Sequence, residues 1–143
     1  MRAPLDVNVL IALLDEQHLH HQLATHWLSA HLADGWASCR LTQNGCIRVM
    51  SQVRYPNSQN AAVVAEYLSS AANGAAHEFW PDDVSLLADG LVDWSRIVGS
   101  KQVTDVYLLA LAHHHSGRFV TFDQHIPTKA LKHLSARSLL VLA

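Results

Sequence analysis

The sequence predicts an α/β fold: a three-layer α/β/α sandwich with a central, mostly parallel five-stranded sheet. Short apolar segments alternate along the chain with longer segments of helical periodicity, and strands joined through helices form parallel sheets covered on both faces. The 143 residues are enough for one domain with a substantial core. Because 50% of them are hydrophobic and 15% are charged, a disordered polyelectrolyte is excluded. We therefore expect a single domain over residues 1–143.

The N-terminal part of the chain predicts one strand and two helices. Residues 3–7 are expected to form a short strand, and residues 8–16 continue as a helix. In residues 18–33, large apolar side chains recur at the spacing of one helix face. These are Leu19, Leu23, Trp27, Leu28 and Leu32. The apolar run near the N-terminus is interrupted by Asp6 and Asn8, so it is too short for a membrane span, and it lacks a signal-peptide cleavage pattern.

The next part of the chain predicts a second strand and two more helices. Residues 35–39 are expected to form a compact strand. Residues 41–53 follow as a helix with an apolar stripe, and Thr42 is its expected N-cap. Ser58 is expected to cap a further helix over residues 59–73.

The C-terminal half predicts three strands separated by helices and turns. The strands are expected at residues 77–81, 118–122 and 137–142, and the helices at residues 83–98 and 105–117. Gly90 is a weak point within the first of these helices, and Thr104 is the expected cap of the second.

Aspartates follow two of the predicted strands. Asp6 ends the first strand and Asp123 ends the fourth. Ligands of open parallel sheets bind outside the carboxyl ends of the strands, where the strand order reverses. If these two strands are neighbours, Asp105 in the first turn of the helix before the fourth strand lies close to both carboxylates. Each aspartate alone has a simpler explanation, as a turn former, a strand end or a helix-dipole partner, but their joint placement favours a site.

Three clustered carboxylates repel one another unless a cation compensates them. A hard divalent ion with oxygen ligands suits them, so Mg²⁺ is the predicted cofactor and Mn²⁺ is the alternative. Asp6, Asp105 and Asp123 are therefore the predicted metal ligands and catalytic residues, with Asp6 and Asp105 preferred as direct ligands. Asn8 and Thr121 are predicted to orient these carboxylates through hydrogen bonds.

Four motifs together resemble those of the PIN domain, and more closely those of VapC-type ribonuclease toxins of bacterial toxin–antitoxin pairs. They are "LDVNVLIALL", "WASCRLTQNGCIRVM", "TDVYLLALA" and "GRFVTFD", in that order over essentially the whole chain. The resemblance implies an α/β/α sandwich and Mg²⁺-dependent endoribonuclease activity, in which a metal-activated water attacks the RNA phosphodiester. It also implies a homodimer and neutralisation by a cognate antitoxin.

The second motif departs from the family at Gln43, where most relatives carry a glutamate. Glutamine keeps the shape and one acceptor oxygen, but it brings no charge and cannot act as a base. Gln43 is thus predicted to lie beside the carboxylates as a variant of the usual acid. The alternative is a PIN-like module that binds RNA or a partner without cleaving it.

The charge balance limits how this chain can bind RNA. Its net charge of −2 excludes a generic electrostatic nucleic-acid binder, so RNA must be held by a local patch or a bound metal. Arg40, Arg48 and Lys101 are candidates for phosphate contacts. The chain has only two cysteines and no Cys-x-x-Cys motif, which fits a reducing cytoplasm. The interrupted apolar run near the N-terminus predicts no membrane association.

Histidine is unusually frequent, with 11 residues in the chain. They include the groups "HLHHQLATH" at residues 18–26 and "HHH" at residues 113–115. Because no HExxH motif accompanies them, they are interpreted as structural or solvent-facing residues, not zinc ligands. His125, which follows Asp123 closely, is the one histidine expected to approach a substrate.

Overall fold

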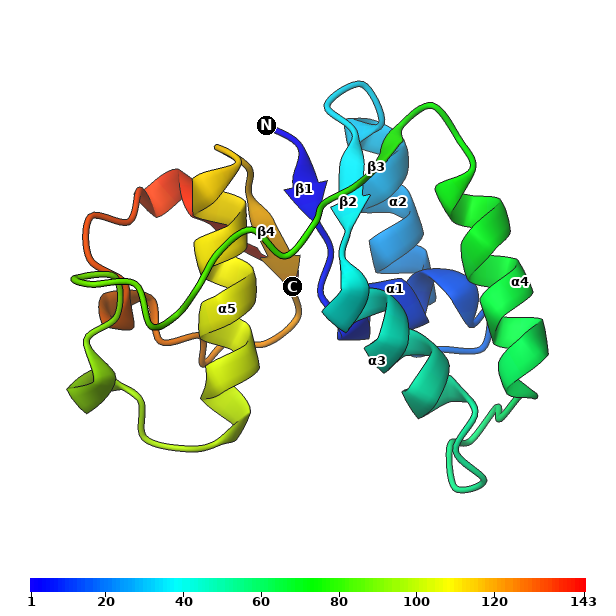
Figure 1. The fold of residues 1–143 in the computed structure, drawn as a ribbon. Coiled ribbons are helices and arrows are strands. Elements are labelled where there is room, and N and C mark those ends of the chain that lie inside the picture. The colour runs from blue at the N-terminus through cyan, green and yellow to red at the C-terminus, as the bar shows by residue number, and fades with distance from the viewer.

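The computed structural model describes residues 1–143 and shows strands alternating with helices (Figure 1). The strands are β1 (Ala3–Pro4), β2 (Trp36–Ser38), β3 (His77–Phe79), β4 (Phe119–Thr121) and β5 (Leu139–Val141). The α-helices are α1 (Val7–Leu14), α2 (His21–His31), α3 (Arg40–Met50), α4 (Ala61–Ala72) and α5 (Lys101–His114). The predicted α/β fold class is confirmed.

All strand pairs in the sheet are parallel. β1 pairs with β2, which pairs with β3, and β4 pairs with β5. A parallel bridge between Leu5, just after β1, and Val120 of β4 joins the two groups. The resulting order is β3-β2-β1-β4-β5, with β1 in the middle. The chain moves outward from β1 to β3 and then returns to the other side of β1, so the strand order reverses between β1 and β4.

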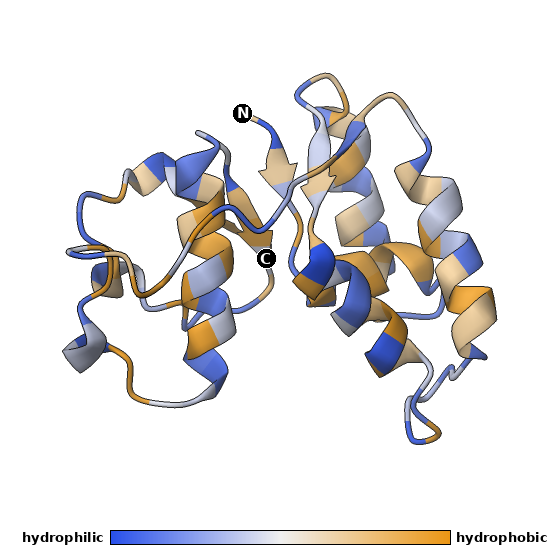
Figure 2. Cartoon of the chain, in the orientation of Figure 1, coloured by the Kyte–Doolittle hydropathy of each residue, from blue (hydrophilic) through white to orange (hydrophobic).

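Helices cover both faces of the sheet, as Figure 1 shows for α1–α4 on one side and α5 on the other. Strand residues alternate between two hydrophobic cores, because successive side chains point to opposite faces. Leu5 and Val120 join the core under α1–α4, whereas Ala37 and Phe119 join the core under α5. Helix α1 is hydrophobic over most of its length (Figure 2) because it lies within the first core. No helix is both long and apolar enough to cross a membrane.

The helix predicted over residues 83–98 is wrong. This segment consists of turns and one short 3₁₀ helix, Trp94–Arg96. The Ser85 hydroxyl accepts a hydrogen bond from the Leu87 N–H, and the Asp93 carboxylate accepts one from the Ser95 N–H. Such local side-chain bonds compete with the helical pattern, and Gly90 with φ +74° interrupts it further.

The three predicted helix caps also differ from the structure. Cys39 is the N-cap of α3, and Thr42 instead completes the cap from inside the helix by accepting the Cys39 N–H at 3.0 Å. Asn60, not Ser58, caps α4 through its side-chain oxygen. Helix α5 begins at Lys101, so Thr104 lies within it.

Candidate metal centre

The carboxyl ends of three neighbouring strands carry buried polar side chains. Asp6 follows β1, Ser38 ends β2 and Thr121 ends β4, and all three are less than 9% exposed. Since buried polar groups are costly unless they are hydrogen-bonded, each needs a partner at this edge of the sheet. The edge coincides with the point of strand reversal, where ligands of parallel sheets bind.

The Thr121 hydroxyl links the polar groups of this edge. It donates a hydrogen bond to Asp6 Oδ2 at 2.7 Å, and it accepts the Asp123 N–H at 3.0 Å and Asn8 Nδ2 at 3.3 Å. The other Asp6 oxygen, Oδ1, accepts the N–H of Val7 at 2.7 Å. Both oxygens of Asp6 are therefore held, and the orientation of the carboxylate is fixed by its own neighbours.

Asn8 connects the start of α1 to the segment that follows β4. Its Nδ2 donates to Thr121, while its Oδ1 accepts the Phe122 N–H at 3.3 Å. Both ends of the amide are used, so a residue of α1 also fixes the backbone next to Asp123.

Asp123 and Asp105 approach Asp6 from two further elements. Asp123 lies two residues beyond β4, at the same edge of the sheet as Asp6. Its Oδ1 accepts the His125 N–H at 2.8 Å, so Asp123 also forms a turn. Asp105 lies in the second turn of α5, not in the first turn as expected, because the helix begins at Lys101. The Asp105 carboxylate accepts no hydrogen bond within the protein, unlike the other two.

Burial and neighbouring negative charges raise the pKa of two of these carboxylates, Asp105 and Asp6. Burial, together with the negative charges of Asp6 and Asp123, raises the pKa of Asp105 to about 6. Burial also raises the pKa of Asp6, although its hydrogen bonds from Thr121 and Val7 act in the opposite direction and the Asp123 charge adds to the rise. None of the ion pairs in the structure involves these aspartates. The cluster thus holds negative charge that the protein itself does not neutralise.

The carboxylate oxygens of Asp6, Asp105 and Asp123 are suitable ligands for a hard divalent cation. The charge of such a cation would offset the repulsion among the three carboxylates. The three carboxylates are not yet as close as one ion would need. At least one pair is separated by more than 4.8 Å, whereas opposite ligands of Mg²⁺ are about 4.2 Å apart. Asp105 is the one of the three carboxylates that no hydrogen bond within the protein holds in place.

Gln43 has a different set of contacts. Its Nε2 donates to Ser38 Oγ at 3.0 Å, and that hydroxyl also bonds His77 Nε2 at 2.8 Å. Gln43 is not hydrogen-bonded to any of the three aspartates. Its helix nevertheless packs tightly on the start of α1, since a Cβ at Gly45 would lie 2.7 Å from a methyl group of Val7.

The comparison with known proteins gives the family of this chain. The PIN-domain family model matches residues 4–131. Ribonuclease VapC44 of Mycobacterium tuberculosis is 52% identical over 131 residues, which cover 92% of each chain. The chain is a PIN-domain protein of the VapC family. Ribonuclease VapC39 of the same organism is a further relative of this VapC-family chain, 38% identical with 91% of this chain and 94% of the relative covered.

A solved structure shows the same fold. The crystal structure of VapBC2 from Rickettsia felis, bound to a DNA fragment from their promoter, matches the VapC-family chain with a TM-score of 0.63. The match covers 100% of both chains at 14% sequence identity. At this identity the likeness supports the α/β/α arrangement and nothing finer.

The remaining residues singled out in the sequence lie apart from the carboxylates or at their border. Arg40 pairs with Asp82 at 3.0 Å, Arg48 is exposed on α3, and Lys101 is exposed one turn before Asp105. His125 is exposed and touches Asp123 only through its backbone. Sequence reasoning missed Ser38. Its position at a strand end, equivalent to that of Asp6 and Thr121, was the signal that could have revealed it.

Proposed function

We propose that this chain is the toxin of a toxin–antitoxin pair, a metal-dependent endoribonuclease that cleaves RNA phosphodiesters at the Asp6–Asp105–Asp123 cluster. The observation that carries the proposal is the uncompensated negative charge of this cluster at the strand reversal, in a chain whose relatives are named ribonucleases. Carboxylates alone would repel an RNA phosphate, so the cluster needs a cation to act on that substrate.

Each residue has a role that follows from its contacts. Asp6, held by Val7 and Thr121, presents a fixed carboxylate to the cation, and Asp123 is held by the turn to His125. Asp105 is free to complete the set by rotation. Mg²⁺, or Mn²⁺, would neutralise charge on the phosphate and lower the pKa of a water. Thr121 and Asn8 keep the carboxylates in place, as neighbours that orient metal ligands do.

The metal requirement gives the direct test of this function. Purified chain is expected to cleave RNA with Mg²⁺ or Mn²⁺ and to lose this activity in excess chelator, because the carboxylates then have no cation to offset their charge. Cleavage is followed on a labelled RNA by gel electrophoresis, with Asp6→Asn as the inactive control. Cleavage that persists in excess chelator, or in Asp6→Asn, would contradict the proposal.

The second candidate function is binding of RNA or of a partner without cleavage. Gln43 is the observation that favours it, because the resemblance to VapC-type toxins implies an acid at this position and this chain has an uncharged glutamine. A chain of this kind would retain RNA on a filter with Mg²⁺ present and yet leave it intact. The cleavage assay therefore separates the two functions.

A homodimer and an antitoxin complete the proposed assembly. Helix α2 fully buries only Ala24, and α4 only Val64 and Leu68. Leu23, Trp27 and Leu28 of α2 pack on the first core but stay partly exposed, and Tyr67 of α4 is exposed. Surfaces of this kind mark interfaces. In this assembly, RNA is the substrate of the aspartate cluster. The antitoxin protein would bind a further apolar groove of the dimer.

We expect light scattering to give the mass of a dimer at micromolar concentration, because apolar area on α2 and α4 would be removed from water at the interface. Replacing the exposed Tyr67 of α4 by Glu is expected to shift the mass toward that of a monomer. A monomeric mass for the unmodified chain across that range would contradict the dimer.

A further inference from the structure

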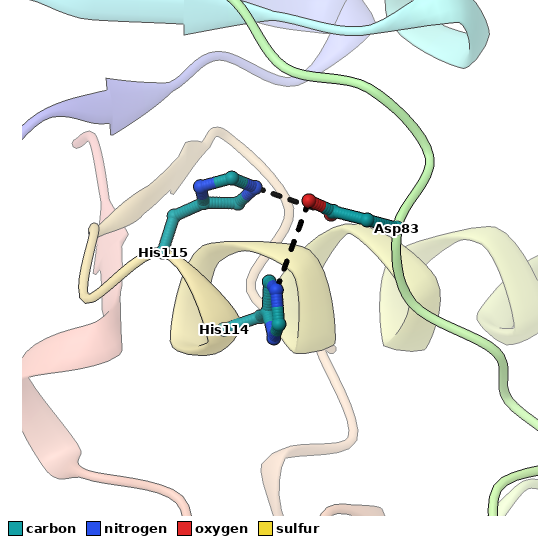
Figure 3. Close-up of side chains that lie close together, drawn as sticks. All are labelled: Asp83, His114 and His115. Atoms are coloured by element: carbon teal, nitrogen blue, oxygen red, sulfur yellow. Dashed lines mark hydrogen bonds and ion pairs between the residues drawn. The ribbon is translucent and has the colours of Figure 1, made fainter.

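A second group of metal-ligating side chains lies at the C-terminal end of α5. It consists of Asp83, from the segment after β3, and His114 and His115, from the "HHH" sequence (Figure 3). Their potential ligand atoms all lie within 4.8 Å of one another, and no other three acidic, histidine or cysteine side chains in the chain are as close. The aspartate cluster is at the opposite end of the helix, since Asp105 lies near its start.

The end of the helix explains how two consecutive histidines can point to one acid. Successive side chains within an α-helix diverge by about 100°. His114 is the last residue of α5, whereas His115 is the cap with φ −90° and ψ 8° and has left the helical path. Figure 3 shows both rings directed toward the Asp83 carboxylate.

The spacing of the ligand atoms fits a tetrahedral metal ion. His115 Nε2 lies 3.2 Å from Asp83 Oδ1, and His114 Nε2 lies 3.7 Å from Asp83 Oδ2. Ligands of a tetrahedral Zn²⁺ with bonds near 2.1 Å are separated by roughly 3.4 Å. Both observed distances are close to this value, although they run to the two different oxygens of Asp83. The side chain of His114 is 52% exposed, which leaves it room to adjust.

The surroundings hold one ring in position and favour a cation. The His115 ring stacks on Trp80 with ring centres 4.2 Å apart and an angle of 15° between planes. Trp80 is itself fixed, because its Nε1 donates to Glu78 at 2.8 Å. The C-terminal end of a helix carries partial negative charge, which attracts cations.

We propose that Asp83, His114 and His115 bind a borderline transition metal ion, of which Zn²⁺ is the natural candidate, at a site separate from the aspartate cluster. Two imidazoles and one carboxylate suit Zn²⁺ and not Mg²⁺, which prefers oxygen ligands throughout. The three side chains leave a fourth position for water. Binding would tie the irregular segment after β3 to α5 and so stabilise the fold.

The histidine sequence supplies a matched control for the test. Calorimetric titration with ZnCl₂ is performed on untagged chain in millimolar Mg²⁺, comparing wild type with Asp83→Asn, His114→Ala, His115→Ala and His113→Ala. His113 is the neighbouring histidine of the same sequence and is not part of the group. We expect the first three variants to lose one equivalent of Zn²⁺ or to bind it about tenfold or more weakly. His113→Ala should bind as wild type does, and RNA cleavage should be unchanged in all four variants.

Thermal unfolding provides the second measurement. Because a ligand that binds only the folded state stabilises it, Zn²⁺ should raise the Tm of wild type and of His113→Ala but not that of the other three variants. Circular dichroism without metal confirms that each variant is folded. The proposal is overturned if all variants bind as many equivalents as wild type with the same affinity, if His113→Ala loses the ion equally, or if Asp6→Asn abolishes Zn²⁺ binding while the three ligand variants retain it.

Discussion

Replacing Asp105 by Asn is expected to abolish RNA cleavage and, in metal-free protein at neutral pH, to increase the free energy of unfolding. The two effects have one cause. The carboxylate lies near the negative charges of Asp6 and Asp123 in a partly buried position, and burial and these charges favour its protonated form. Asparagine removes the charge that repels these neighbours, and it also removes a ligand of the cation. Losing that ligand should slow cleavage by about 10²–10⁴-fold.

The stability effect should depend on pH. Because the pKa of Asp105 is about 6 in the folded protein and 3.8 in its reference state, the folded state binds its proton more tightly. Its contribution to stability is therefore fully present below pH 3.8 and is lost as the pH rises through about 6. The loss in wild type is on the order of 2–3 kcal/mol at most, since partial exposure screens the charges. Asp105→Asn should not show this loss.

Urea unfolding in excess chelator, at several pH values between acid and neutral, measures the difference in free energy of unfolding between Asp105→Asn and wild type. The stability advantage of Asp105→Asn should grow as the pH rises from about 3.8 to about 6 and be complete above that pH. Asp89→Asn, an exposed aspartate in the segment after β3, is the control for a change of net charge. If the gain in free energy of unfolding is the same at all pH values, or is as large for Asp89→Asn, the charge of Asp105 is not repelled by the other two carboxylates.

Replacing Gln43 by Glu is expected to tighten Mg²⁺ binding and to destabilise the metal-free fold. The new carboxylate would keep its contact with Ser38 by accepting that hydroxyl in place of donating to it. If it lies beside the cluster, a fourth negative charge should strengthen Mg²⁺ binding by roughly 1–3 kcal/mol at an effective dielectric constant near 20. Without metal, the same charge adds repulsion among the carboxylates.

Because these two effects have opposite signs, the Tm of Gln43→Glu should rise more steeply with Mg²⁺ concentration than that of wild type. Calorimetry gives the affinity, and thermal scans with and without Mg²⁺ give the Tm. Gln52→Glu, just past the other end of α3, carries the same change of charge away from the cluster. If Gln43→Glu matches wild type in both measurements, Gln43 does not lie at the site and only begins a helix.

The sequence predicted the elements that tertiary contacts reinforce. β1, β2 and β4 are short apolar segments that the structure buries, and α5 has a long apolar pattern that packs into one core. The segment 83–98 also contains apolar residues, but several remain exposed, and Ser85 and Asp93 form local turns instead. Turns of this kind depend on single hydrogen bonds, which hydrophobic periodicity does not reveal.

The positions of the three aspartates followed from one assumption about topology, that β1 and β4 are neighbours. The bridge between Leu5 and Val120 provides that neighbourhood. Thr121 and Asn8 were expected to orient the carboxylates, but the atoms that pair could not be derived from the sequence. The bonds of Thr121 to Asp6 and Asn8 join residues more than 100 positions apart and depend on side-chain rotation. The sequence also did not predict that Asp83 lies beside His114 and His115. Asp83 is distant from them in sequence, and His115 reaches it only because it lies past the end of α5.

The central place of β1 in the sheet also determines when the site can form during protein synthesis. β1 is the first strand to be made, yet one of its two neighbours, β4, is made nearly last. The bond between Asp6 and Thr121 spans 115 positions, which at 5–20 residues per second corresponds to roughly 6–23 s of translation. Until then Asp6 has neither the Thr121 hydroxyl that orients it nor Asp123, the last carboxylate of the cluster. An unfinished chain that ends before Thr121 therefore contains the first aspartate of the site but cannot assemble the site itself.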